Sequence, residues 1–143
     1  HSGIDNSGIA SRQYAKYTKF IDPNRGVIHF YVNKLGAGNM IKVTVLYPNE
    51  EEKKFDHGYW TTTHLNLVQS LLGPMGLVNG EMEKGVSGTD PNAPAPFIAV
   101  AHLYFNKVEE VHAAFMEHGR AIMGDIANYT DIKPQFQISE TLL

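Results

Sequence analysis

The segment Phe97–Phe105, FIAVAHLYF, carries the strongest strand signal in the chain and decides its fold class. Apolar residues fill both alternating sets of positions, which is typical of a strand at the centre of a sheet covered on both faces. The polar exception is His102. Because side chains alternate along a strand, His102 is expected on the opposite face from Ala99 and Ala101.

Three further segments supply the remaining strands of this sheet. Ile41–Pro48 alternates apolar and polar residues and predicts a strand with one buried face. Residues 77–88 form a weaker strand signal, in which Gly80 and Gly85 indicate a bulge or the close approach of another backbone. Residues 131–139, DIKPQFQIS, predict the last strand.

A first helix is predicted between the first two of these strands, over residues 57–72. Asp56 is suited to its N-cap, because a short carboxylate can accept from the free N–H groups of the first turn. Gly73 and Pro74 end it, since proline cannot continue a helix and glycine can adopt a left-handed cap.

A second helix is predicted after Phe97–Phe105. Asn106 and Glu109 have the spacing of a capping box, and the helix is expected to end near Gly119. Its expected buried stripe is Val108, Val111 and Phe115. The order of elements is then β-α-β-β-α-β, the ferredoxin-like plan of α+β proteins.

One face of this sheet is expected to need a partner. Two helices cover only one face of a four-stranded sheet, and the other face also carries apolar residues. The simplest cover is a second copy of the same sheet, so we expect a homodimer through the open face of the sheet.

Residues 1–39 differ from residues 40–143, which we take as the folded domain. They are rich in Gly, Ser and Asn without a sustained period, apart from the strand-like run VIHFYV at 27–32. We expect a loosely ordered N-terminal arm, or an extension added for expression, that contributes little to stability.

Composition excludes several classes of function. A formal net charge of −3 gives no electrostatic basis for binding nucleic acid or an anionic membrane, so neither is expected as a partner. The chain has no cysteine, which excludes disulfides and thiolate metal sites. No apolar run has the length of a membrane span or the order of a signal peptide, so a cytoplasmic protein is expected.

His64 is the candidate catalytic residue. Its distance of four residues from both Trp60 and Val68 places it on the buried stripe of the first helix. Burial favours the neutral imidazole, which suits a general base in an apolar pocket. The alternative is a core histidine that is satisfied by a hydrogen bond to a tyrosine, an asparagine or a backbone carbonyl.

No metal site and no cofactor are expected. His57 and His64 share a helix face, but seven residues at about 1.5 Å each place them roughly 10 Å apart, too far to bind one ion. His112 and His118 point to different sides of their helix. Acidic pairs at 50–52 and 109–110 are explained by solvent exposure and the helix dipole.

A pocket for a planar apolar ligand is expected beside His64. Tyr47, Tyr59, Trp60 and His102 are its candidate ligand-binding residues, although aromatic residues at these spacings also suit an ordinary core. In GDIANYTDI, residues 124–132, Asp125 is expected to accept from nearby backbone amides in a turn.

Several segments together resemble the EthD family, which is named for a protein of ethyl tert-butyl ether degradation and lies within the dimeric α+β barrel superfamily. The resemblance covers about residues 40–140 and is carried by IKVTVLYPN, FDHGYWTTTHLNLV, LLGP, GVSG, PFIAVAHLYF and IMGDIANYTDIKPQFQISE, in that order. It implies a homodimer with a small pocket in each subunit between sheet and helices. It also implies a histidine in the first helix, which falls on His64.

These observations favour a small-molecule enzyme, or an enzyme-like protein, that acts on an apolar, oxygenated or aromatic compound. His64 is expected to transfer the proton, as in a cofactor-independent oxidoreductase, isomerase or lyase. One alternative is a non-catalytic protein that binds a small ligand as an accessory of a degradation pathway. Another is a heme-binding protein, because one histidine suffices as an axial ligand.

Overall fold

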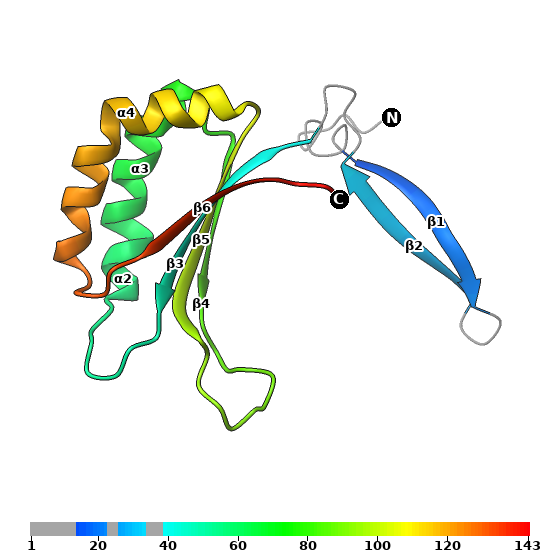
Figure 1. Ribbon diagram of the computed structural model, residues 1–143, viewed down its shortest axis with the longest axis horizontal. Helices are drawn as coiled ribbons and strands as arrows, with labels where there is room; N and C mark the ends of the chain where they lie inside the picture. Colours follow the sequence, from blue (N-terminus) through cyan, green and yellow to red (C-terminus); the bar gives the residue numbers. More distant parts are fainter. Residues whose placement is uncertain (1–13, 23–25, 34–38) are drawn as a thin grey trace. The chain divides into compact units, whose positions relative to one another are not determined.

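The computed structural model describes residues 14–22, 26–33 and 39–143. The chain divides into two compact units. One contains the N-terminal segment up to Met40 together with residues 140–143, and the other spans Ile41–Ser139 (Figure 1). Across the described residues, no helix combines the length and apolar character needed to cross a membrane.

The N-terminal unit contains a β-hairpin. Strand β1 (Tyr14–Asp22) pairs antiparallel with β2 (Gly26–Asn33). The strand-like run at 27–32 is therefore confirmed, but the expected loose order is wrong for β1, because its aromatic and β-branched residues favour a strand once a partner strand is present. The rest of the expected arm lies outside the described residues, at 1–13, 23–25 and 34–38.

The larger unit contains a four-stranded sheet in the order β4-β5-β3-β6 (Figure 1). Its strands are β3 (Ile41–Pro48), β4 (Asn79–Lys84), β5 (Phe97–Phe105) and β6 (Gln135–Glu140). The central strand β5 runs antiparallel to both β3 and β4, as the sequence predicts. β6 begins later than residue 131, immediately after Pro134, which has no N–H to donate to a ladder.

The first helical segment covers the predicted residues 57–72 but changes its winding along the way. It consists of α2 (His57–Tyr59), a π-helical stretch η1 (Trp60–His64) and α3 (Leu65–Leu72). The predicted cap is confirmed, because the Asp56 carboxylate accepts from the Tyr59 N–H at 3.0 Å.

The end of this helical segment differs from the prediction. Gly73 keeps right-handed helical geometry and opens a 3₁₀ turn, η2 (Gly73–Met75). The left-handed residue is Gly76, at φ 114°. Because the tighter turn continues past Pro74, the reversal that glycine permits comes three residues later than expected.

The second helix, α4 (Val108–Asp125), ends six residues later than predicted. Gly119 does not end it, because its cost of about 1 kcal/mol in a helix interior is outweighed by the burial of Ile122 in the next turn. The capping interaction also lies one residue later, with the Glu110 carboxylate accepting from the Lys107 backbone N–H at 3.2 Å. A 3₁₀ turn, η3 (Ile126–Asn128), follows.

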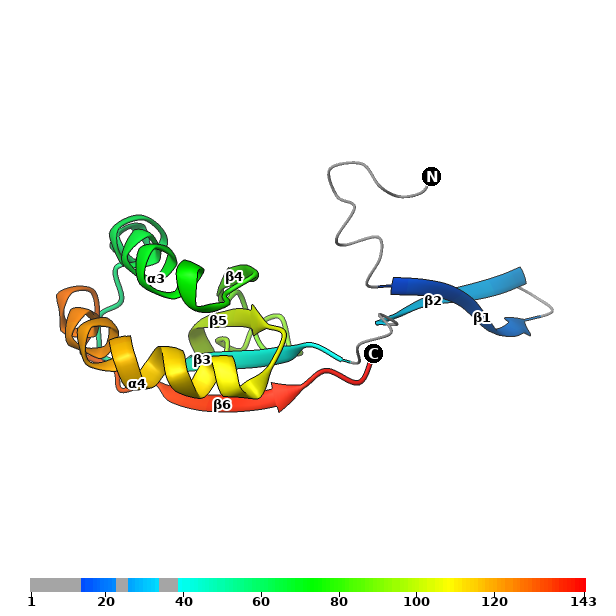
Figure 2. The same cartoon turned by 90° about the horizontal axis from the view of Figure 1, so that it is seen from above.

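Both helices cover the same face of the sheet (Figure 1 and Figure 2). The core between them is apolar and combines one face of β3 and β5 with the inner sides of α3 and α4. Its members include Val43, Val45, Tyr47, Ala99, Ala101, Phe105, Leu72, Val111 and Ala114. Of the predicted stripe of α4, Val111 is fully buried while Val108 and Phe115 are partly exposed. The α+β ferredoxin-like fold is confirmed.

Gly85 is expected to be intolerant of a side chain, because its backbone lies against β5. A Cβ at this position overlaps the carbonyl oxygen of Phe97 and comes within 2.7 Å of the Ala95 Cβ. We expect Gly85→Ala to lower the free energy of unfolding by about 1–3 kcal/mol in urea titrations. Gly73→Ala, with no atom within 4 Å of the added Cβ, is the control and is expected to change it by less than about 1 kcal/mol. Equal losses in both variants contradict this account.

Candidate functional site

A cavity of about 520 Å³ lies between the helix-covered face of the sheet and the helices. Its walls are mostly apolar, with Val45 and Ala101 from the sheet and Val68 and Leu72 from α3. His64 also lines it and is only 5% exposed. Among the described lining residues, His64 is the buried one whose ring nitrogens can donate or accept a hydrogen bond.

The local winding of the first helical segment helps to set the position of His64. The Leu65 N–H reaches back to the Trp60 carbonyl, five residues earlier, as in a π-helix. Thr61 and Thr62 donate their hydroxyls to the carbonyls of His57 and Gly58, at 2.8 and 2.6 Å. These hydrogen bonds from threonine hydroxyls satisfy backbone carbonyl groups where the hydrogen-bond pattern of the helix changes from α to π. Single π-turns of this kind are frequent at functional sites.

Both ring nitrogens of His64 have partners from the end of α4 and the turn that follows. Nδ1 lies 2.8 Å from the Asp125 Oδ2, and Nε2 lies 3.3 Å from the Tyr129 hydroxyl. The pair His64–Asp125 is well shielded from solvent, with side-chain exposures of 6% and 14%. A shielded carboxylate beside Nδ1 fixes the orientation of the ring.

The Asp125 carboxylate is held in its ionised form by its neighbours. Burial acts to raise its pKa, but hydrogen bonds from His64, Asn128 and Tyr59, with the charge of His64, lower the pKa below its ordinary value. The Tyr59 hydroxyl donates to Oδ1 at 2.8 Å and the Asn128 amide donates at 2.9 Å. The expectation that Asp125 accepts from backbone amides is wrong, because it lies in the last turn of α4 and points toward side chains.

The hydrogen-bond chain continues from His64 to the cavity wall through two tyrosines. The Tyr129 and Tyr47 hydroxyls are 2.6 Å apart, and Tyr47 lines the cavity. Burial raises the pKa of both phenols, and the neighbouring Tyr47 raises that of Tyr129 further. Both tyrosines therefore keep their protons and act as hydrogen-bond donors.

The direction of donation follows from these protonation states. An ionised Asp125 only accepts, so Nδ1 of His64 carries a proton and donates it. In the neutral ring, Nε2 is then the acceptor, and it receives the hydroxyl proton of Tyr129. The Tyr129 oxygen in turn accepts from Tyr47. The chain thus points from the cavity wall toward His64.

The structure brings together some of the expected ligand-binding residues and separates others. Tyr47 and Trp60 line the cavity with His64, and their rings meet edge to face with centroids 5.9 Å apart. Tyr59 lies outside the lining, stacked on Tyr129 at 5.9 Å and bonded to Asp125. These contacts suit a residue that supports the site rather than one that touches a ligand.

His102 lies on the opposite face of the sheet from the cavity. Its cross-strand neighbour on β3 is Thr44, and its Nδ1 lies 3.5 Å from the Thr44 hydroxyl. The alternation along β5 that separates His102 from Ala101 is as predicted. Its expected role beside the cavity ligand has no geometric support.

Sequence reasoning missed Asp125 and Tyr129 as members of the site. The available signal was their spacing, since Asp125, Asn128 and Tyr129 are three and four residues apart and can share one side of a helical turn. The run Thr61–Thr63 was a signal of the irregular helix winding before His64, because consecutive β-branched residues are unusual in a regular helix.

Comparisons with known proteins agree with this fold. Residues 48–133 match the family model of the EthD domain. The solved structure of an EthD-like protein from Ralstonia eutropha JMP134 is 42% identical, covering 74% of this chain and 95% of that one, with a TM-score of 0.70. An ethyl tert-butyl ether D (EthD) family protein from Bacillus halodurans C-125 is 20% identical over 72% and 99% of the two chains, with a TM-score of 0.52. The comparison with curated proteins gave no match.

The state of Asp125 predicts a pH-dependent contribution to stability. Its folded pKa is below the ordinary value of 3.8, so its contribution is fully present above that value and is lost as pH falls through the folded pKa. We expect Asp125→Asn to lower the free energy of unfolding by about 1–3 kcal/mol at pH 7 and by progressively less below pH 3.8. Urea titrations between pH 7 and about pH 3 measure this difference. The exposed Glu117→Gln serves as control, and a loss for Asp125→Asn that is constant with pH contradicts the prediction.

Proposed function

This chain belongs to the EthD family, and from that membership and the His64 cavity we propose that it acts on a small apolar compound by proton transfer. The compound is of an oxygenated or aromatic class. We place this function in the unit Ile41–Ser139 and regard residues 1–39 as an accessory arm.

The observation that carries the proposal is the 2.8 Å contact between His64 and Asp125 at the wall of an apolar cavity. Asp125 holds a proton on Nδ1 and leaves the Nε2 lone pair as the base. It also stabilises the positive ring that forms when Nε2 takes up a proton. A positioned base of this kind typically supplies about 10²–10⁴-fold in rate.

The two tyrosines give the proton a route from the cavity to His64. A substrate proton passes to the Tyr47 oxygen while Tyr47 gives its own proton to Tyr129, and Tyr129 gives its proton to Nε2. Because both phenols have raised pKa values, a free tyrosinate is disfavoured and the transfers occur together. When the proton is returned to the bound compound, the protonated His64 acts as the general acid.

The walls of the cavity support this ligand class. Apolar side chains provide most of the lining, so desolvation favours an uncharged ligand. Trp60 and Tyr47 meet edge to face at this wall, and such aromatic edges suit a flat ring system. A carbonyl or hydroxyl group on that ligand completes the polar contact at Tyr47.

A non-catalytic ligand-binding role uses the same cavity and is the second candidate. It requires only the apolar walls and makes no use of the bond between His64 and Asp125. A heme-binding function is less favoured, because both ring nitrogens of His64 already have hydrogen-bond partners. To bind a heme iron, His64 must give up its contact with Tyr129 or Asp125.

We also propose that two copies associate through the open face of the sheet. On that face Leu46 lies opposite Val100, and Ile98 lies beside them on β5. All three are partly exposed in the single chain. A second sheet with the same residues can cover them by a two-fold interface.

His64→Gln is expected to separate stability from function. The variant should unfold within about 1.5 kcal/mol of the parent, because glutamine retains a polar group of similar reach, and its proton-transfer activity should fall at least about tenfold. We propose 1-tetralone, a flat aromatic ketone, as the probe. Proton NMR in D₂O follows exchange of the hydrogens next to its carbonyl.

The control for this experiment is His112→Gln, at an exposed position of α4. It should retain the parent exchange rate. Calorimetric binding of 1-tetralone without accelerated exchange in the parent favours the ligand-binding role. Equal exchange by the parent and His64→Gln contradicts the assignment of His64.

The proposed dimer predicts a mass of twice the 15.9 kDa chain by light scattering at micromolar concentration. Val100→Glu places a charge in the open face and should yield single chains with the parent circular dichroism spectrum. Val86→Glu, at a loop position that is 90% exposed, should remain dimeric. A parent mass of a single chain rules out the dimer.

A further inference from the structure

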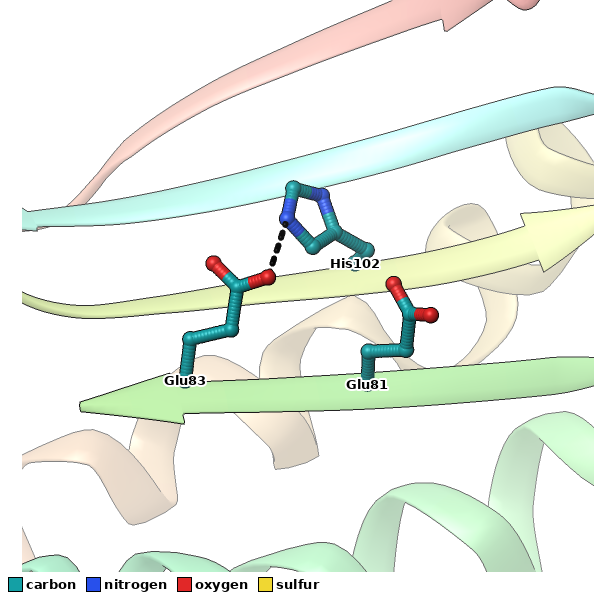
Figure 3. Close-up of side chains that lie close together, drawn as sticks. All are labelled: Glu81, Glu83 and His102. Atoms are coloured by element: carbon teal, nitrogen blue, oxygen red, sulfur yellow. Dashed lines mark ion pairs between the residues drawn. The ribbon is translucent and has the colours of Figure 1, made fainter. Parts of the chain in front are cut away.

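A second group of chemically active side chains lies on the open face of the sheet. Glu81 and Glu83 of β4 and His102 of β5 bring one potential ligand atom each to within 4.8 Å of one another (Figure 3). This group, named the β4–β5 cluster below, combines two carboxylates with an imidazole. Glu83 and His102 lie outside the lining of the His64 cavity, whereas Glu81 also belongs to that lining.

The register of the two strands produces this arrangement. Glu81 is the direct cross-strand neighbour of His102, and Glu83 is that of Val100, the next residue on the same face of β5. Because Glu81 and Glu83 are two residues apart on one strand, their side chains project from the same face. Paired strands therefore hold all three donors at fixed backbone positions.

The imidazole is the fixed member of the cluster and the carboxylates are the adjustable members. The His102 side chain is 15% exposed, with Nδ1 at 3.5 Å from the Thr44 hydroxyl and Nε2 at 3.5 Å from Glu83 Oε2 (Figure 3). The Glu83 side chain is 56% exposed and free to turn toward Nε2. The exposed Glu81 carboxylate accepts from the Tyr104 hydroxyl at 3.2 Å.

The charges on this face favour a cation. Glu81 and Glu83 carry two negative charges on neighbouring positions of one strand face, where they repel each other. The contact between Glu83 and His102 is long, at 3.5 Å, and is a charge pair only when the ring is protonated. A divalent ion removes the repulsion and takes the imidazole in its neutral form as a ligand.

We propose that Glu81, Glu83 and His102 form a binding site for a divalent transition-metal ion of the Zn²⁺ class. Imidazole and carboxylate together suit Zn²⁺ and its neighbours, whereas Mg²⁺ and Ca²⁺ prefer oxygen ligands alone. Bonds of about 2.0–2.2 Å require the donors to move closer than they lie here, and rotation of the two exposed carboxylates provides that movement. Water completes the coordination.

This site is independent of the proposed proton transfer. The cluster shares no side chain with the chain of hydrogen bonds from Tyr47 to Asp125. β4 is an edge strand of the sheet, so in the proposed dimer the ion lies toward the rim of the interface. The expectation of no metal site was based on spacing along helices and loops, and the β4–β5 cluster depends on pairing between strands.

Zn²⁺ titrated into the metal-free 143-residue chain by calorimetry tests the proposal. We expect one ion per chain with micromolar affinity, weakened at least about tenfold in both His102→Ala and Glu83→Gln, since each loses a direct ligand. His112→Ala, which removes an exposed histidine from α4, is the matched control and should bind as the parent does. Because Glu83 is exposed, Glu83→Gln should keep the parent fold even if His102→Ala does not.

A spectroscopic measurement identifies the ligand directly. On addition of Zn²⁺, the ¹⁵N resonance of His102 Nε2 should shift by far more than those of the other histidines. Parent-like affinity in Glu83→Gln and His102→Ala, or a shift centred on another histidine, overturns the proposal. The absence of saturable binding up to millimolar Zn²⁺ overturns it as well.

Discussion

The hydrogen bond between His64 Nδ1 and the Asp125 carboxylate is the interaction on which the site depends. It joins the π-helical stretch of the first helical segment to the last turn of α4, and so ties together the two elements that enclose the cavity. Without it, a nearly buried imidazole beside apolar walls lacks a partner for Nδ1, and its orientation is not fixed. With it, Nε2 faces the Tyr129 hydroxyl, and the polar chain reaches the cavity at Tyr47.

The central strand β5 separates two different chemistries on the two faces of one sheet. On the helix side, Ala99 and Ala101 are small, and Ala101 lies in the cavity wall. On the open side, His102 meets the carboxylates of β4 (Figure 3). Because successive side chains point to opposite faces, one short run of residues serves both. A change confined to either face can then be tested with little effect on the other.

The sequence predicted the fold well because alternation and helical periodicity directly reflect burial. The four strands, the Asp56 cap and the burial of His64 all follow from such patterns. It failed where the deciding interactions join distant segments. The continuation of α4 past Gly119 depends on packing of Ile122, and the role of Asp125 depends on His64, 61 residues away. The register between β4 and β5 that assembles Glu81, Glu83 and His102 is likewise invisible in the spacing of residues along the chain.

We infer that Asp125 holds His64 in the tautomer that leaves Nε2 as the proton acceptor. Side-chain ¹⁵N NMR of the 143-residue chain measures this directly, by comparing the two ring nitrogens of His64 when the ring is neutral. We expect a proton on Nδ1, an unprotonated Nε2, and loss of this preference in Asp125→Ala. A neutral ring with its proton on Nε2, or an unchanged tautomer in Asp125→Ala, contradicts it.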